Sequence, residues 1–204
     1  MNRPRSLLLL IMLLSLSAGC DKEPERMDNY LVEFATLLKE GTGYRFGLDN
    51  NRIVIPEKPD DYEGNEGQRV ILNYTPLKGD TIRIRHITDI FTGVIQTAGF
   101  PEQYAGDPVK ILSIWVGGEY LNMILETEYH SVAHKVSLLR DPSSAPADLW
   151  FSHSRNNDPP GYPQKMYASF SLQHLRAGSN GSAIPFRLFI NTDTGVREFH
   201  FELK

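Results

Sequence analysis

The residues of this 204-residue chain that could carry acid–base chemistry are few and widely spaced. Asp89, His153 and Asp158 form one candidate hydrolytic set, because carboxylates and an imidazole can accept and donate protons during a reaction. No motif supplies a nucleophile or a phosphate cradle beside them, since the sequence contains no GxSxG, P-loop, GxGxxG or HExxH. A hydrolase built on these three residues is therefore kept as an alternative, and no residue is assigned as catalytic.

Two groups of side chains have the composition, but not the arrangement, of a metal site. His130 and His134 are four residues apart, yet they lie between two expected strands and have no third ligand nearby, which favours turn histidines. The acidic loop around Asp61 offers several oxygen donors. Counted from Asp61, an EF-hand needs Gly where Glu66 stands and Glu where Leu72 stands. The sequence therefore predicts no metal and no cofactor.

The chemistry that the sequence does predict is acylation of Cys20. Arg3 and Arg5 precede the apolar run Leu7–Leu14, and small residues then lead to the cysteine. A basic start, a short apolar core and a small-residue cleavage zone make residues 1–19 a secretory signal peptide. The cysteine after that zone resembles the lipobox of bacterial lipoproteins, in which it is acylated, commonly with palmitate, and becomes the N-terminus. An ordinary secretion signal followed by an incidental cysteine is the alternative.

The predicted anchor determines what we expect of location and charge. Several acyl chains on Cys20 bind a membrane stably, so the sequence predicts an outer-membrane lipoprotein with residues 20–29 as its tether. The acid-rich tether resembles a surface-export signal, which leaves the cell surface and the periplasmic face both open. Without Arg3 and Arg5, 19 basic residues oppose 25 acidic ones, a net charge of −6. This excess of acid argues against nucleic acid as a partner.

Cys20 is also the only cysteine of the chain. The sequence therefore offers no disulfide, although an envelope compartment would allow one. It also leaves no thiol for catalysis or for a zinc site.

The first half of the mature chain has the alternation of short strands. Tyr30–Lys39 fits either an amphipathic helix or a long strand, and its β-branched and aromatic residues favour the strand. Gln68–Pro76 and Thr81–Ile87 alternate apolar and polar residues, while Ile90–Ile95 could be a last strand or a short helix. About five strands within residues 30–98 predict an OB-like barrel, with an SH3-like barrel as the alternative.

The second half is predicted to be a separate β-domain. Residues 99–107 are rich in Pro and Gly and are expected to be a linker. Residues 108–204 hold about seven predicted strands, which favours an antiparallel β-sandwich. Ile111–Val116 is one of them, and Gly117-Gly118 after it predicts a tight turn. The surest local prediction is the final hairpin, with its turn at Asn191–Gly195.

The run Trp115–Asn122, which reads WVGGEYLN, resembles the NigD-like lipoprotein family of Bacteroidetes. The lipobox, Asn73–Leu77 and Ile87–Ile90 precede this run, in the order found in the family. The resemblance covers most of the mature chain and implies an N-terminal OB-like barrel and a C-terminal β-sandwich. It implies little about chemistry. Bacteriocin immunity is the role usually suggested for the family. From its apolar neighbours alone, Trp115 is expected to be a core anchor.

These observations favour a non-enzymatic lipoprotein that presents two β-domains to a protein, peptide or glycan at the cell envelope. The sequence does not identify the ligand-binding residues. A bacteriocin immunity protein is the more specific alternative, and a basic toxin would suit the charge of −6.

Overall fold

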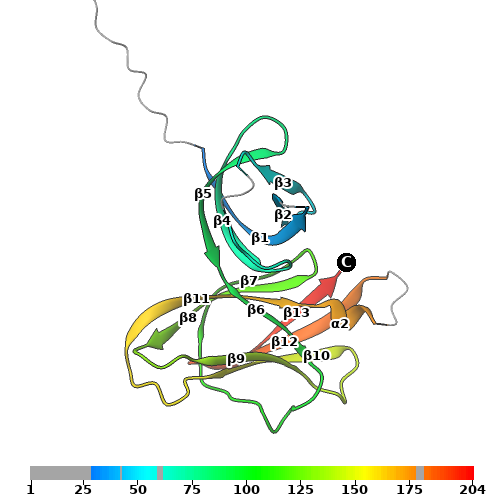
Figure 1. Cartoon of the computed structure of the whole chain (residues 1–204). Helices are drawn as coiled ribbons and strands as arrows, with labels where there is room; N and C mark the ends of the chain where they lie inside the picture. The colour runs from blue at the N-terminus through cyan, green and yellow to red at the C-terminus, as the bar shows by residue number, and fades with distance from the viewer. Residues whose placement is uncertain (1–28, 42, 59–61, 178–181) are drawn as a thin grey trace, which may run out of the picture. The chain divides into compact units, whose positions relative to one another are not determined.

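The computed structural model describes residues 29–41, 43–58, 62–177 and 182–204, and residues 31–204 form one compact unit. This unit holds a closed five-stranded barrel and an eight-stranded sheet (Figure 1). The predicted all-β class, with an OB-like barrel followed by a β-sandwich, is confirmed. Residues 1–28 lie outside the described residues, so the predicted signal peptide, the lipidation of Cys20 and most of the tether stay predictions.

The barrel closes in the strand order β1-β2-β3-β5-β4. Its strands are β1 (Leu31–Glu40), β2 (Gly43–Leu48), β3 (Ile53–Pro56), β4 (Arg69–Pro76) and β5 (Thr81–Asp89). The long strand β1 pairs with β4 along its first part and with β2 along its second, while β3 runs parallel to β5. One strand thus closes the barrel by bonding on both sides, as expected for an OB-like architecture.

Period-two alternation explains the barrel core. Val70, Leu72 and Tyr74 of β4 are at most 1% exposed, so the apolar face predicted for this strand is the interior face. In β1, Ala35 and Leu37 are fully buried two residues apart. The strand prediction for this segment is therefore confirmed, and the amphipathic-helix alternative is wrong.

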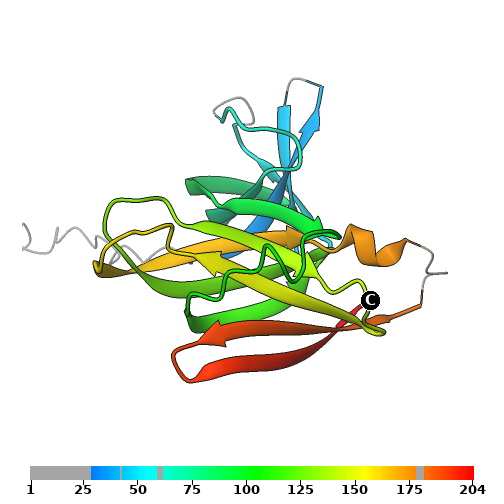
Figure 2. The same cartoon turned by 90° about the horizontal axis from the view of Figure 1, so that it is seen from below.

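The eight-stranded sheet has the order β13-β12-β10-β9-β6-β11-β8-β7. Its strands are β6 (Phe91–Gln96), β7 (Lys110–Gly117), β8 (Tyr120–Tyr129), β9 (Lys135–Arg140), β10 (Ala147–Ser154), β11 (Tyr162–Ser171), β12 (Ile184–Thr192) and β13 (Gly195–Leu203). A short helix, α2 (Gln173–Arg176), follows β11. The predicted final hairpin is β12–β13, which forms one edge of the sheet (Figure 2).

Strand β6 joins the two layers of the sandwich. Its residues Phe91–Val94 pair with β11, and Ile95 and Gln96 pair with β9 on the other side. Both pairings are parallel, as is β10 with β12, whereas the other four pairings of the sheet are antiparallel. The sequence predicts a strand or a short helix at Ile90–Ile95 and assigns this segment to the barrel. The pairing places it in the larger sheet.

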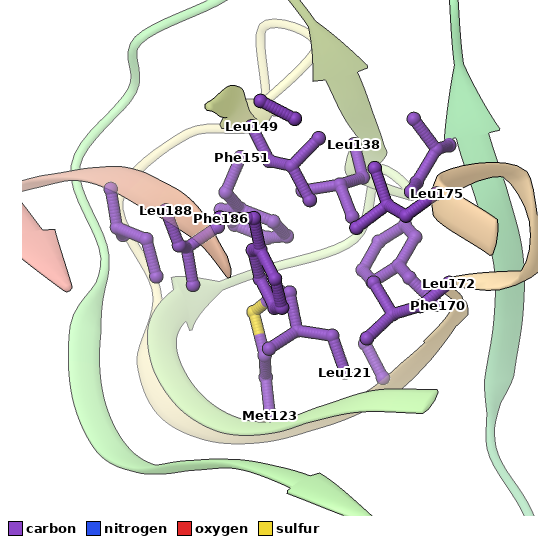
Figure 3. Close-up of a cluster of buried hydrophobic side chains, with 14 of the residues drawn as sticks. Leu121, Met123, Leu138, Leu149, Phe151, Phe170, Leu172, Leu175, Phe186 and Leu188 are labelled. Atoms are coloured by element: carbon purple, nitrogen blue, oxygen red, sulfur yellow. The ribbon is translucent and has the colours of Figure 1, made fainter. Parts of the chain in front are cut away.

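The sandwich core lies between the layers that β6 connects. Leu121 and Met123 of β8 face Leu149 and Phe151 of β10, with Phe170 of β11 beside them (Figure 3). All five side chains are at most 2% exposed. Burying a large apolar side chain stabilises a fold by roughly 1.5–3 kcal/mol, so this core fixes the positions of the strand ends that carry polar groups.

Residues 99–107, expected to be a linker, pack on β10. Phe100 stacks on Trp150 with ring centroids 5.3 Å apart, and Tyr104 meets the same ring edge-on at 5.5 Å. The backbone N–H of Asp107 donates to the carbonyl of His153 at 3.0 Å, and the N–H of His153 donates to the carbonyl of Ala105 at 2.9 Å. The segment therefore belongs structurally to the sandwich.

A buried guanidinium connects barrel and sandwich. Arg69 is 1% exposed, and its side chain donates to Thr36 of the barrel and to Asn122 and Ser169 of the sandwich at 2.9–3.3 Å. It also pairs with the carboxylate of Asp49 at 2.8 Å. We call these five residues the junction network.

The WVGGEYLN run supplies the sandwich side of this network. Trp115 packs edge-on against Phe34 of β1 at 4.8 Å, and the ring of Tyr120 lies 4.3 Å from the Arg69 guanidinium. Gly118 has φ +58, as its predicted turn requires. Glycine is required at position 117 for a different reason, because a Cβ there would lie 2.6 Å from the carboxylate of Asp49. The motif that carries the resemblance therefore joins the two sheets.

Candidate functional site

A second set of buried polar groups lies at one end of the sandwich. There the β8–β9 connection (residues 130–134), the β10–β11 connection (residues 155–161) and the segment before β7 are bonded to one another. We call Asp107, His134, His153 and Asp158, which make these bonds, the polar cluster.

Asp158 organises the β8–β9 connection. Its carboxylate accepts three backbone N–H bonds, from His130 at 2.7 Å, Ser131 at 2.9 Å and Val132 at 2.8 Å. The preceding residues, Asn156 and Asn157, have φ of +55 and +63, a conformation that asparagine adopts more readily than most residues. The β10–β11 connection thus places one carboxylate under three donors.

The two histidines form a hydrogen-bonded chain that ends on Asp158. His153 Nδ1 lies 3.0 Å from the backbone carbonyl of Asp107, which can only accept, so Nδ1 donates. His153 Nε2 then accepts from His134 Nδ1 at 2.9 Å. His134 Nε2 lies 3.3 Å from the Asp158 carboxylate.

Burial, hydrogen bonds and neighbouring charges shift the pKa values of two of these groups, His153 and Asp158. Burial lowers the pKa of His153, with further lowering by nearby His134 and Arg155, while the bond to the Asp107 carbonyl opposes the shift. Burial alone would raise the pKa of Asp158, but its three backbone donors and His134 outweigh that effect and lower it. In the folded state His153 thus favours its neutral form, and Asp158 its charged form.

This geometry restricts what the polar cluster can do chemically. Both ring nitrogens of His134 and of His153 are engaged inside the cluster. Neither imidazole has a nitrogen directed at a substrate, which a general base requires. Across the described ranges, no group of three or more His, Cys, Asp or Glu side chains is arranged to hold a metal ion.

The candidate hydrolytic residues are divided between the two sheets. His153 and Asp158 both contact His134 in the sandwich. Asp89 lies at the end of β5 and accepts a hydrogen bond from the Tyr62 hydroxyl in the barrel. Of the calcium candidates, Asp60 and Asp61 lie outside the described residues.

The barrel contains a cavity of about 360 Å³. Tyr44, Tyr62 and Ile84 line it, and the two tyrosine rings meet edge-on at 6.0 Å. At its rim Glu57 binds Arg83 through two hydrogen bonds, at 2.6 and 3.3 Å, and this contact lowers the pKa of Glu57. The cavity thus has an aromatic lining and, at its rim, a carboxylate whose charge is balanced by an arginine.

Sequence reasoning missed the residues that organise both polar networks. Arg69 occupies an ordinary alternating position in β4, and nothing local distinguishes it from a solvent-facing arginine. The spacing of four residues suggests His130 as the neighbour of His134, whereas the hydrogen-bond partner of His134 is His153, nineteen residues later. Strand pairing creates these contacts, and no local spacing predicts them.

The family assignment follows from the sandwich. Residues 93–202, more than half of the chain, match the family described as "NigD-like C-terminal beta sandwich domain". The chain belongs to the NigD-like family. The matched region begins within β6, in agreement with the pairing of that strand in the larger sheet, and it includes the whole polar cluster.

Solved structures with the same fold come from Parabacteroides and Bacteroides species. A Parabacteroides distasonis protein named as a candidate toxin-related protein is 26% identical, with a TM-score of 0.78 over 86% of this chain and 94% of its own. A NigD-like immunity protein from Bacteroides caccae is 24% identical, with a TM-score of 0.69 over 85% and 96%. A candidate lipoprotein from Bacteroides fragilis is 13% identical, with a TM-score of 0.62 over 86% and 97%. The last two show a shared fold alone.

No curated protein matches the chain. Among the residues that the structure describes, no helix has the length and apolarity needed to cross a membrane.

Proposed function

We propose that this NigD-like protein is a lipid-anchored protein of the outer membrane that binds a protein, peptide or glycan partner and catalyses no reaction. Cys20 is the proposed attachment point, and the folded unit that begins at Leu31 carries the binding surfaces. The observation that carries the proposal is the closed hydrogen bonding of the polar cluster. His153 and Asp158, whose shifted pKa values elsewhere would suggest catalysis, both bond to His134 and to backbone groups.

The anchor is supported by the sequence signal and by a fold shared with a candidate lipoprotein. Labelling cells with an alkyne fatty acid tests it. The wild-type chain should acquire label and sediment with outer membranes, whereas the Cys20→Ala variant should do neither. An unlabelled wild-type chain in the soluble fraction would contradict the anchor and leave the binding proposal to be tested separately.

Binding is tested by affinity capture from detergent-solubilised outer membranes with Cys20 intact. The expected result is one stoichiometric protein or glycan species, retained with Cys20 and reduced in the Cys20→Ala control because the anchor brings partners together. A hydrolytic activity abolished by His153→Gln, with folding unchanged, would contradict the non-enzymatic proposal.

Bacteriocin immunity is the second candidate, supported by the fold shared with a NigD-like immunity protein and by the net charge of −6, which suits a basic toxin. Cells that lack the gene should become more sensitive to a cognate bacteriocin, and wild-type protein should restore resistance. Unchanged sensitivity across a bacteriocin panel would remove this candidate and leave the broader binding proposal standing.

A further inference from the structure

A cavity of about 230 Å³ lies beside the polar cluster, at the same end of the sandwich. It is lined by the start of β7, the end of β8, the residue after β10, the start of β11 and the β12–β13 turn. The lining residues that matter here are Thr127, Glu128, Arg155 and Asp193. Five separate segments therefore converge on one small concave site.

Two polar atoms of the cavity wall have unused hydrogen-bonding capacity. Thr127 Oγ1 and Arg155 Nε are both buried and, within the described part of the chain, have no hydrogen-bond partner. A buried donor without a partner costs about 1–3 kcal/mol, more if it is charged, so such groups need an explanation. Two of them in one cavity point to a ligand that satisfies both.

The backbone of Arg155 is fixed before any ligand arrives. Its N–H donates to the Asp107 carboxylate at 2.7 Å, and its carbonyl accepts from the N–H of Asp158 at 2.9 Å. These bonds tie Arg155 to the polar cluster on both sides. The cluster therefore fixes the backbone from which the Arg155 side chain reaches the cavity, which reduces the ordering that binding would require.

The chemistry of the wall selects the ligand. A carboxylate accepts from both an arginine N–H and a threonine hydroxyl, and charge-assisted bonds of this kind are strong. Glu128 and Asp193, exposed at the rim, oppose a multiply charged anion but favour positive charge beside the carboxylate. Glu126, the other lining acid, is paired with Lys110 at 2.8 Å.

We propose that this cavity binds the free C-terminal carboxylate of a partner polypeptide whose preceding residues include lysine or arginine. Capture of a C-terminal carboxylate is a known mode of peptide recognition. The inference rests on the proposed binding function and names the chemical group of the partner that the sandwich recognises. Arg155 and Thr127 bind the carboxylate, and Glu128 and Asp193 attract the basic side chain.

Titration calorimetry on the full chain in detergent tests this inference with acetyl-Gly-Lys-Gly as the probe. The free acid should bind, and its carboxamide should bind roughly 10- to 100-fold more weakly, because one charge-assisted contact is lost. Arg155→Gln should weaken the free acid similarly, and Thr127→Val should weaken it less. Arg197→Gln, a surface arginine over Phe199, is the matched control and should leave affinity unchanged.

Equal affinity for acid and carboxamide, no measurable binding, or full affinity in Arg155→Gln would overturn the inference. Glycine that binds as well as the peptide would also overturn it, because the ligand would then be a free amino acid. If Arg155→Gln still captures the envelope partner at wild-type yield, the carboxylate site is wrong and the proposed function stands. If the wild-type chain captures no partner while binding the peptide, the proposed function fails instead.

Discussion

Two arginines of the same folded unit, Arg69 with its whole side chain buried and Arg155 with a buried Nε, have opposite surroundings. Arg69 in the junction network has four side-chain partners from both sheets and lies against the Tyr120 ring. Arg155 at the polar end of the sandwich has a buried Nε without a partner among the described residues. A buried charge is tolerated where its hydrogen bonds are complete. The comparison therefore separates an arginine that maintains the fold from one held ready for a ligand.

The largest effect that this comparison predicts is the loss of Arg69. Arg69→Met should lower the free energy of unfolding by up to about 3–5 kcal/mol, because removing one partner leaves the partly buried carboxylate of Asp49 without its counter-charge. Urea denaturation of the full chain, with Arg197→Met as the surface control, measures it. A loss below about 1 kcal/mol would show that the junction network does not maintain the fold.

A smaller effect is expected from Gly117→Ala. The added Cβ would lie 2.6 Å from the Asp49 carboxylate and push it away from Arg69, which should cost about 1–3 kcal/mol. Ser113→Ala on the same strand is the control. Unchanged stability in Gly117→Ala would mean that the junction can yield without losing its ion pair.

The polar cluster predicts a pH dependence that the junction network does not. Because burial lowers the pKa of His153 in the folded state, the unfolded chain binds a proton more readily below about pH 6.5. Stability should thus fall from pH 7 to pH 5, by at most about 1.4 kcal/mol per pH unit from this group.

The low pKa of Asp158 adds a second loss only below about pH 4, where the unfolded carboxyl becomes protonated. Urea titrations at several pH values check both windows, with His153→Gln as the comparison. The variant should lose the slope between pH 7 and 5 and keep the loss at lower pH. An identical slope in wild type and variant would assign the pH dependence to other groups.

The smallest effect on stability is expected from the loss of Arg155. Arg155→Gln should change the free energy of unfolding by no more than about 0.5 kcal/mol, because no side-chain partner of its Nε is lost. Urea denaturation beside Arg69→Met measures it. A loss comparable to that of Arg69→Met would mean that Arg155 also maintains the fold.

The local pattern of the sequence is sufficient to predict where the strands lie, but not which strands pair with one another. Alternation in β4 correctly predicted the buried face of Val70, Leu72 and Tyr74, since burial with a period of two is a property of each strand alone. The run Trp115–Asn122 was correctly recognised, but its role in binding Arg69 required the barrel and the sandwich together. The assignment of β6 to a sheet, and the contact of His134 with His153, likewise depend on segments distant in sequence.

Photocrosslinking in living cells is the most direct test of the claim that the polar end of the sandwich binds a partner. A photoreactive residue at Glu128, on the rim of the Arg155 cavity, is compared with one at Lys78, in the β4–β5 turn of the barrel. The expected result is a discrete adduct from position 128 that disappears in an Arg155→Gln background, and none from position 78. An adduct from position 78 alone, or one from position 128 that persists without Arg155, would contradict it.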